Sequence, residues 1–179
     1  MYYTARYASP LGSILLACEG KNLVGLWYEG QKYFAATIQD ASAKKAELTL
    51  FADAAQWLDA YFAGHKPDIS ALPLAPAGSD FRKAVWDILC EIPYGTCTTY
   101  GNISAMLAAR LHKKSMSSQA VGGAVGHNPI SIIIPCHRVV GSNGSLTGYA
   151  GGFAKKIQLL EREGVDMARF FIPATGTAL

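Results

Sequence analysis

The chain has 179 residues, of which 50% are hydrophobic and 16% are charged, and its formal net charge is +3. This composition is typical of a compact globular protein with a sizeable core, and it excludes a disordered chain. No apolar run approaches the roughly 20 residues that span a bilayer, and the N-terminus lacks the pattern of a signal peptide. We therefore expect no membrane partner and a cytoplasmic protein, or a nuclear one if the source is a eukaryote.

The first half of the chain predicts an antiparallel sheet followed by a helix. Three β-prone segments alternate with turns, at residues 2–7, 13–18 and 23–28. Apolar residues at helical spacing, from Phe51 to Tyr61, predict a helix over residues 47–62. Prolines then resist both helix and sheet, which indicates a linker over residues 64–78.

The second half predicts short helices over residues 79–89, 98–107 and 117–126. Ser79 or Asp80 can cap the first of them, and Thr98-Thr99 can cap the second. We expect an N-terminal domain, with its linker, over residues 1–75 and a mainly helical domain over residues 76–179. The second and third of these helices form a candidate helix-turn-helix. Such pairs are also common in helical cores, so the pattern alone leaves DNA binding and plain packing both open.

The loop between those two helices is basic, with Arg110, His112, Lys113 and Lys114. A solvated surface loop and a contact to an anionic partner both fit such a cluster. The helix that follows carries small residues, namely Ala120, Gly122, Gly123, Ala124 and Gly126. Because glycine costs a helix about 1 kcal/mol relative to alanine, either another element packs very closely here or a ligand such as a DNA groove does.

A cysteine with a neighbouring histidine is the main chemical signal of the chain. Residues 132–134 predict a buried β-branched strand that ends on Pro135 and delivers Cys136 beside His137. Only the thiolate is a useful nucleophile, so an adjacent base matters. Neighbours on a strand point to opposite faces, so either the chain turns after Pro135 or a water bridges the sulfur and the imidazole.

The last helix supplies a carboxylate for this pair. Phe153, Ile157 and Leu160 define its buried face, and Glu163 follows on the same face, in the last turn, where the helix dipole disfavours an anion. Such a carboxylate needs a partner. The alternative is a glutamate at a frayed helix end that pairs with a surface lysine or with Arg162. A Cys-His-Glu set serves thiol proteases, acyl transferases and alkyl acceptors alike.

The remaining cysteines, Cys18, Cys90 and Cys97, form no C-x-x-C pair. We expect them to be free thiols with structural roles. Cys18 and His65 are too few for a four-ligand zinc site, so no metal is expected.

Several ordered motifs together resemble the O6-alkylguanine-DNA alkyltransferases, also called methylated-DNA–protein-cysteine methyltransferases. They are Ile92-Pro93-Tyr94-Gly95, Ala120-Val121-Gly122-Gly123-Ala124, Asn128-Pro129, Pro135-Cys136-His137-Arg138-Val139, Tyr149-Ala150-Gly151-Gly152 and Leu159-Leu160-Glu161-Arg162-Glu163-Gly164. The resemblance implies an α/β protein of two domains, an N-terminal ribonuclease H-like domain and a C-terminal helical domain with a winged-helix-like helix-turn-helix. It also implies repair of DNA without a cofactor, by irreversible and stoichiometric transfer of an alkyl group from O6-alkylguanine to Cys136.

The resemblance assigns a role to each matching catalytic residue. His137 would activate Cys136 through a bridging water, and Glu163 would orient His137. Tyr100 matches the tyrosine that helps to rotate the nucleotide and protonates the leaving guanine.

Further residues would bind double-stranded DNA through its minor groove, with the damaged base flipped out and the protein acting as a monomer. Asn128 braces the helix-turn-helix, and Val139 reads the guanine amine with its carbonyl. Tyr149, Ala150 and Gly151 close over the base, while the small residues Ala120, Gly122 and Gly123 enter the groove.

Two positions depart from the family pattern. Gln119 stands where the family places an arginine that fills the gap left by the flipped base, so we expect weaker capture of the lesion. The loop before it is about five residues longer than usual, and Lys113 and Lys114 in it are expected to contact phosphates, with a marked salt dependence.

Three alternatives use the same features. A non-enzymatic lesion sensor of this family would lack the acceptor cysteine. A cysteine hydrolase would need an oxyanion hole, for which the sequence has no signature. A helix-turn-helix regulator would leave the Cys-His-Glu set unexplained.

Overall fold

The computed structural model describes residues 1–38, 44–45 and 47–174. It divides the chain into two compact units. The first consists of Met1–Ala77 with Pro129–Ile133, and the second consists of Gly78–Asn128 with Ile134–Leu179. In the part of the chain that is described, no helix is both long and apolar enough to cross a membrane.

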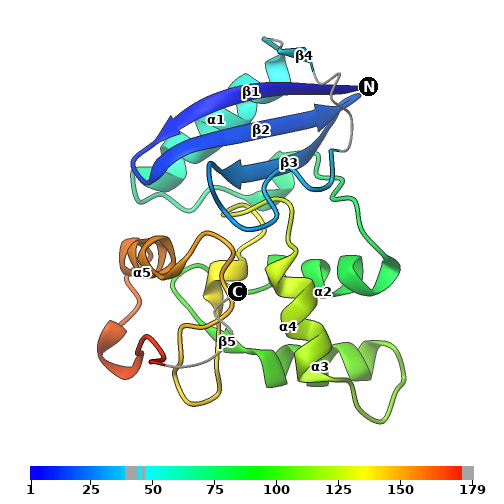
Figure 1. The fold of residues 1–179 in the computed structure, drawn as a ribbon, viewed down its shortest axis with the longest axis vertical. Coiled ribbons are helices and arrows are strands. Elements are labelled where there is room, and N and C mark those ends of the chain that lie inside the picture. The colour runs from blue at the N-terminus through cyan, green and yellow to red at the C-terminus, as the bar shows by residue number, and fades with distance from the viewer. Residues whose placement is uncertain (39–43, 46, 175–179) are drawn as a thin grey trace. The chain divides into compact units, whose positions relative to one another are not determined.

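The first unit is built on an antiparallel meander of β1 (Tyr2–Ser9), β2 (Gly12–Glu19) and β3 (Asn22–Tyr28), seen side by side in Figure 1. Its tight turns use glycines with positive φ, 110° at Gly12 and 58° at Gly20. The short strand β4 (Lys44–Lys45) pairs parallel with β1, so the sheet order is β3-β2-β1-β4. The predicted strands are confirmed, each slightly longer than expected.

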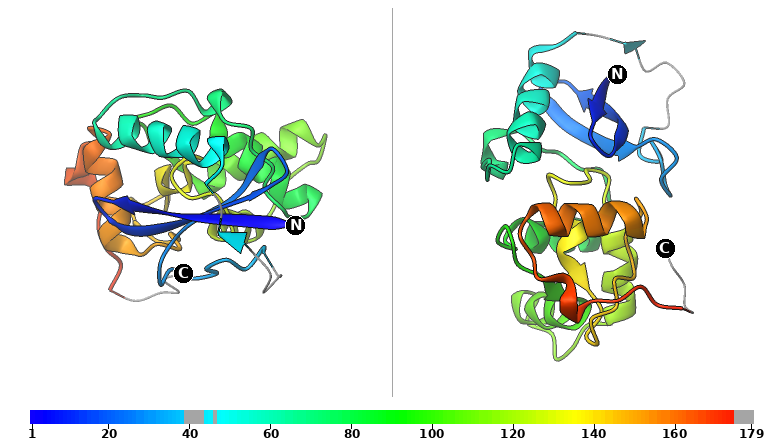
Figure 2. Two further views of the ribbon diagram at one scale, coloured as in Figure 1. Left: turned by 90° about the horizontal axis from the view of Figure 1, so that it is seen from above. Right: turned by 90° about the vertical axis from the view of Figure 1, so that its left-hand side faces the viewer.

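Helix α1 (Thr49–Phe62) covers one face of this sheet (Figure 2). Phe51, Leu58 and Tyr61 are buried, as their helical spacing predicts. The helix begins two residues later than expected because Leu48 is extended and acts as its N-cap. The Tyr7 hydroxyl donates a hydrogen bond of 2.7 Å to Asp59, which ties β1 to the helix.

The expected linker over residues 64–78 is only partly a linker. It contains a 3-10 turn, Ile69–Ala71. The amide of Leu23 donates to the carbonyl of Pro73 (2.8 Å), and the amide of Ala75 donates to Leu23 (2.9 Å). The segment therefore pairs with the edge of β3, where the backbone groups of an edge strand need partners.

A second segment pairs with the same strand. Leu26 donates to the carbonyl of Pro129 (2.8 Å) and accepts from the amide of Ser131 (3.0 Å). These bonds explain why Pro129–Ile133 groups with the first unit although it lies far along the sequence.

The second unit is mainly helical, which confirms the predicted fold class. Its helices are α2 (Asp80–Cys90), α3 (Tyr100–Arg110), α4 (Ser118–Gly126) and α5 (Phe153–Arg162). Short strands β5 (Thr98–Thr99) and β6 (Val139–Val140) pair parallel, and 3-10 turns cover Cys136–Arg138 and Met167–Arg169.

Capping residues begin the first three of these helices, and two of them, Ser79 and Thr99, are among the predicted caps. The hydroxyls of Ser79, Thr99 and Ser117 accept hydrogen bonds from backbone amides in the first turns of α2, α3 and α4. The indole of Trp86 on α2 donates to the carbonyl of Ala124 on α4 (2.8 Å). Helices α3 and α4 are therefore the expected helix pair, packed on α2.

The expected strand over residues 132–134 is absent. Ile132 has a φ of 70°, and the amides of Ile133 and Cys136 each bond to the carbonyl two residues earlier. The chain thus makes compact turns before the 3-10 turn that starts at Cys136. The β-branched residues here reflect burial, since Ile132, Ile133 and Ile134 are all buried, and not an extended backbone.

Candidate active site

Cys136 lies at the start of the 3-10 turn and is only 3% exposed. The side-chain amide of Asn128 donates to its sulfur (3.1 Å) and to the carbonyl of Ile134 (2.8 Å). Because Asn128 follows α4, it ties the helix pair to the segment that carries the thiol.

Burial raises the pKa of the Cys136 thiol to about 11, although the hydrogen bond from Asn128 and the charge of Lys156 lower it. The resting site therefore holds a thiol, which needs a base before it can act as a nucleophile.

The turn after Pro135 brings His137 onto Glu163. The imidazole Nε2 lies 2.7 Å from Oε1 of Glu163, and both side chains are fully buried. An ionised carboxylate only accepts, so Nε2 carries the hydrogen and donates it, which makes Nδ1 the basic nitrogen of the ring. Burial lowers the pKa of His137 despite the opposing effect of Glu163, so the imidazole is neutral at pH 7.

Glu163 has a second partner, a cation that sequence reasoning did not assign. The guanidinium of Arg138 donates to Oε2 (2.8 Å) and Oε1 (3.0 Å) of Glu163, and also to the carbonyl of Ile92 (2.6 Å). The amide of Gly95 donates to Oε2 (3.0 Å). Both oxygens of the carboxylate therefore accept hydrogen bonds, and Glu163 is not a glutamate at a frayed helix end.

Burial alone would raise the pKa of Glu163, but the bonds and charges of His137 and Arg138 outweigh it and lower this pKa to about 2. The carboxylate thus stays ionised at any physiological pH. Arg138 could have been found as the third residue of the Cys-His-Arg run, because a single 3-10 turn can place consecutive side chains around one partner.

Lys156 is the other functional side chain that sequence reasoning missed. Its ammonium is fully buried and donates to the carbonyls of Val139 (2.6 Å) and Thr147 (2.8 Å). Burial lowers its pKa to about 8, and the neighbouring thiols Cys136 and Cys97 oppose this effect. The spacing of the sequence could have identified Lys156 as a buried residue, because it lies four residues before Leu160 on the buried face of α5.

Tyr100 lies within the same unit, beside the loop that follows β6. Its hydroxyl donates to the carbonyl of Thr147 (2.9 Å). Burial, and then the Cys136 thiol, raise the pKa of this tyrosine. A Cβ on Gly148 would lie 1.9 Å from the Tyr100 hydroxyl, so only glycine fits there. The tyrosine therefore remains a hydrogen-bond donor in a tightly packed position.

The loop residues 149–151 also gather at this place. The Tyr149 ring is buried and meets the His137 ring edge-on, with centroids 6.4 Å apart. Gly151 packs against it so closely that a Cβ would lie 2.6 Å from the Tyr149 ring. Ala150 between them is partly exposed.

The other expected DNA-binding residues lie on α4 and in the loop before it. Gln119 and Ala120 are exposed on α4, and Lys113 and Lys114 are exposed in the loop before it. A Cβ on Gly123 would meet nothing within 4 Å. Close packing by another described element therefore does not explain Gly123, whereas a Cβ on Gly122 would lie 3.8 Å from the Tyr100 ring, and Ala124 and Gly126 are buried.

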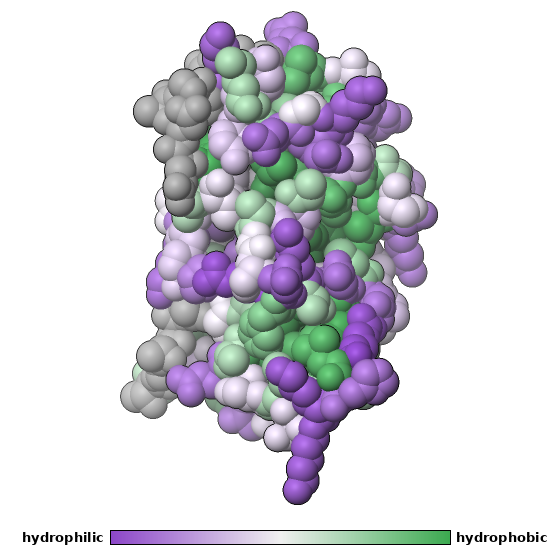
Figure 3. Space-filling view, turned by 90° about the vertical axis from the view of Figure 1, so that its right-hand side faces the viewer, coloured by the Kyte–Doolittle hydropathy of each residue, from purple (hydrophilic) through white to green (hydrophobic). Residues whose placement is uncertain are grey.

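Figure 3 shows the right-hand side of the molecule as it is drawn in Figure 1. In its lower half, hydrophobic residues are bordered by hydrophilic ones.

Of the three remaining cysteines, Cys18 is fully buried, whereas Cys90 and Cys97 are half-buried. Cys90 ends α2, and Cys97 precedes β5.

Comparison with known proteins identifies the family. Two protein-family models match the chain. The family model described as "6-O-methylguanine DNA methyltransferase, ribonuclease-like domain" matches residues 1–76. The family model described as "6-O-methylguanine DNA methyltransferase, DNA binding domain" matches residues 80–165. The chain belongs to the O6-alkylguanine-DNA alkyltransferases. The resemblance that the motifs predicted is thereby confirmed.

Relatives of this alkyltransferase match over most of its length. The methylated-DNA–protein-cysteine methyltransferase of Methanosarcina barkeri is 46% identical over 164 residues, 91% of this chain and 97% of the relative. The protein of the same name from Haemophilus influenzae is 40% identical over 163 residues, 91% of this chain and 86% of the relative.

Solved alkyltransferase structures share the fold. The crystal structure of Mycobacterium tuberculosis O6-methylguanine methyltransferase has a TM-score of 0.77 at 38% identity and covers 98% of this chain and 97% of its own. The structure of Mycobacterium tuberculosis OGT in complex with DNA has a TM-score of 0.76 at 38% identity, with coverages of 97% and 95%.

Proposed function

We propose that this chain repairs DNA by direct reversal, moving the alkyl group of O6-alkylguanine onto its own Cys136. Family membership gives the class of enzyme, a methylated-DNA–protein-cysteine methyltransferase, and DNA as the partner. Cys136 is chosen as the alkyl acceptor because it is buried and is followed by His137, whose imidazole Nε2 is hydrogen-bonded to Glu163.

Proton transfer from the thiol starts the reaction. The Nδ1 atom of His137 takes the proton of Cys136 through a bridging water, while Glu163 keeps Nε2 protonated and stabilises the imidazolium that forms. Arg138 keeps the pKa of Glu163 low, so the carboxylate does not take the proton itself.

The thiolate then displaces the guanine from the alkyl carbon. A bond forms between Cys136 Sγ and that carbon, and the bond to O6 breaks. The leaving guanine takes a proton from the Tyr100 hydroxyl, whose raised pKa keeps it protonated beforehand. The product is a thioether, which is a poor leaving group, so each molecule acts once and the reaction is stoichiometric.

A base inside a duplex is out of reach of a buried thiol, so the damaged nucleotide must be flipped out at a cost of a few kcal/mol. We assign the closing of the site over the base to Tyr149, Ala150 and Gly151. The carbonyl of Val139, which Lys156 already contacts, is assigned to the exocyclic amine of guanine.

The exposed Ala120 and the partly exposed Gly122 and Gly123 support docking of α4 in the minor groove, with these small residues against the DNA. Gln119 is assigned to the gap left by the flipped base. We propose that the protein acts as a monomer, one molecule to each lesion.

The two halves of the chain have different proposed roles. We assign binding and chemistry to residues 76–179 and a supporting role to residues 1–75.

The test is a mass measurement on the full chain. After incubation with a duplex that contains O6-methylguanine, the intact mass should rise by one methyl group, and peptide mapping should place it on Cys136. Cys136→Ala should keep DNA binding and lose the transfer, whereas Cys97→Ser, the matched control, should keep both. A methyl group on another residue, no adduct at all, or turnover of an ester or peptide would reject the proposal.

A further inference from the structure

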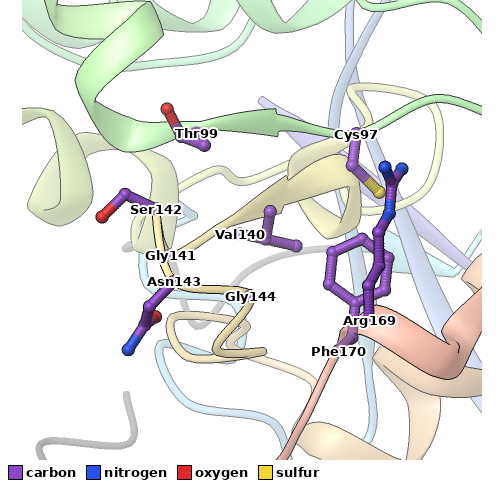
Figure 4. A pocket seen from close by; sticks show the side chains of 9 residues that line it. All are labelled: Cys97, Thr99, Val140, Gly141, Ser142, Asn143, Gly144, Arg169 and Phe170. Carbon is purple, nitrogen blue, oxygen red and sulfur yellow. The ribbon is translucent and has the colours of Figure 1, made fainter.

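Cys97 is a half-buried thiol that lines a cavity of about 310 Å³ in the second unit (Figure 4). The cavity lies beside β5 and β6 and is bounded by the 141–144 loop, Arg169 and Phe170. Its volume falls at the lower end of the roughly 300–1,000 Å³ typical of small-molecule sites. The mechanism above uses none of these side chains.

The walls of this cavity are firmly held. The amide of Gly141 donates to the carbonyl of Ser145 (2.8 Å), which closes the loop. Gly144 has a φ of 90°, and a Cβ there would lie 2.4 Å from the carbonyl oxygen of Arg169. The amide of Phe171 donates to Gly144 (3.1 Å). The backbone of Arg169 is therefore fixed against the loop, at the edge of the cavity.

The cavity has a positive charge beside the thiol. In Figure 4 the Arg169 side chain lies alongside Cys97, and its guanidinium is 5.1 Å from the centroid of the Phe170 ring. Among the described residues, Arg169 makes no ion pair with a carboxylate. Burial raises the pKa of Cys97, and the charge of Arg169 opposes that rise.

Cys90 has a similar exposure in the opposite electrostatic setting. It is the last residue of α2, where the helix dipole is negative. Burial, followed by the charges of Asp87 and Glu91, raises its pKa to about 11. The other two thiols, Cys18 and Cys136, are at most 3% exposed. The chain therefore presents two accessible thiols, one beside a cation and one beside anions.

We propose that Cys97 is a modification site for small disulfides that carry carboxylates, with Arg169 as the group that binds the carboxylate. The Cys97 thiol loses its proton to solvent, and the thiolate attacks one sulfur of the bound disulfide. A new disulfide bond joins Cys97 to that half, the original sulfur–sulfur bond breaks, and the other half leaves as a thiolate that takes up a proton. The bound disulfide is itself the oxidant.

The test compares two disulfides of opposite charge on the reduced full chain. Glutathione disulfide carries carboxylates, and cystamine carries only ammonium groups. Peptide mapping after brief exposure at pH 8 gives the adduct on Cys97 relative to that on Cys90. We expect glutathione disulfide to favour Cys97 and cystamine to lower the ratio by roughly two- to fivefold, the effect of one exposed ion pair. No DNA is present, so the result is independent of alkyl transfer to Cys136.

Substitutions assign the effect to the cavity. Arg169→Gln should lower the glutathione ratio by roughly two- to fivefold, and Arg169→Lys should restore it. Lys21→Gln removes the same charge from an exposed turn of the first unit and should change nothing, while Cys97→Ser should remove the adduct. Equal ratios for the two disulfides, or an Arg169→Gln chain that reacts like the unmodified sequence, would overturn the proposal.

Discussion

At the scale of single residues, the most informative side chain is Glu163, because one carboxylate serves two partners. Its oxygens accept from the imidazole of His137 and from the guanidinium of Arg138. The first bond selects the tautomer of the histidine, and the second keeps the carboxylate ionised. A buried charge of this kind stabilises the fold only while all its partners remain in place.

Replacing Glu163 should therefore destabilise the protein in a pH-dependent way. Glu163→Gln leaves Arg138 with an uncompensated buried charge, which should lower the free energy of unfolding by about 3–5 kcal/mol at pH 7. The folded pKa is below the ordinary value of 4.5, so the contribution is complete above pH 4.5 and is lost as the pH falls towards about 2. The gap between the variant and the unmodified chain should shrink by about 3 kcal/mol over that range.

Urea denaturation at several pH values measures this gap. Glu161→Gln is the matched control, since Glu161 is an exposed neighbour, and it should change the unfolding free energy little. A gap between Glu163→Gln and the unmodified chain that stays constant from pH 7 to pH 3 would contradict the assignment.

Lys156 acts on the thiol through its charge. Lys156→Met keeps the length of the side chain but removes the positive charge that lowers the pKa of Cys136. We expect the pKa of the thiol to rise and methyl transfer at pH 7 to slow, by roughly tenfold for each unit of pKa.

The pH profile of single-turnover transfer distinguishes this role from a structural one. In the unmodified chain, Lys156 loses its proton above pH 8, so its charge should no longer lower the pKa of Cys136 there. The pH profile of Lys156→Met should lack this change above pH 8, and the pH profile of Lys155→Met should retain it. Profiles of the same shape for the unmodified chain and Lys156→Met would show that Lys156 only fills space.

At the scale of elements, local signals predict the helices well and the active-site segment badly. The predicted caps at Ser79 and Thr99 are confirmed because a capping hydroxyl and its amide lie within one turn of chain. The strand expected at 132–134 is wrong because a short run of buried β-branched residues has no period that separates a strand from tight turns.

Helix α4 carries Gln119, the departure from the family pattern that we expect to weaken capture of the lesion. Gln119 is exposed at its start, so an arginine fits there without repacking. Gln119→Arg should tighten binding to a lesion-containing duplex by roughly tenfold, the effect of one charge-assisted contact of about 1.5 kcal/mol. Binding and single-turnover transfer should be measured on the same duplex.

Ser118→Arg provides the control, because it adds the same charge one residue earlier on α4. If Ser118→Arg and Gln119→Arg tighten DNA binding equally, general charge attraction accounts for the increase in affinity. Position 119 then has no specific role in holding the lesion.

At the scale of the whole molecule, the net charge is small, so DNA affinity depends on where the positive charges are placed. Lys113 and Lys114 are exposed in the loop that precedes α4. If both contact phosphates, replacing them with alanine should reduce the slope of log affinity against log salt concentration by about 2. Titrations at several salt concentrations measure that slope, and Lys21→Ala with Lys44→Ala is a control of equal charge.

The sequence by itself determined the family and the order of the main elements, because both depend on motifs and patterns that are local in the chain, and it predicts Cys136, His137 and Glu163 as one set. The tertiary structure alone decided which further side chains join that set. Arg138 and Lys156 acquire their roles from partners far along the sequence, such as the carbonyls of Ile92 and Val139. Likewise, a pairing with Leu26 places Pro129–Ile133 in the first unit. Long-range hydrogen bonds and desolvation leave no local pattern, so only the folded chain reveals them.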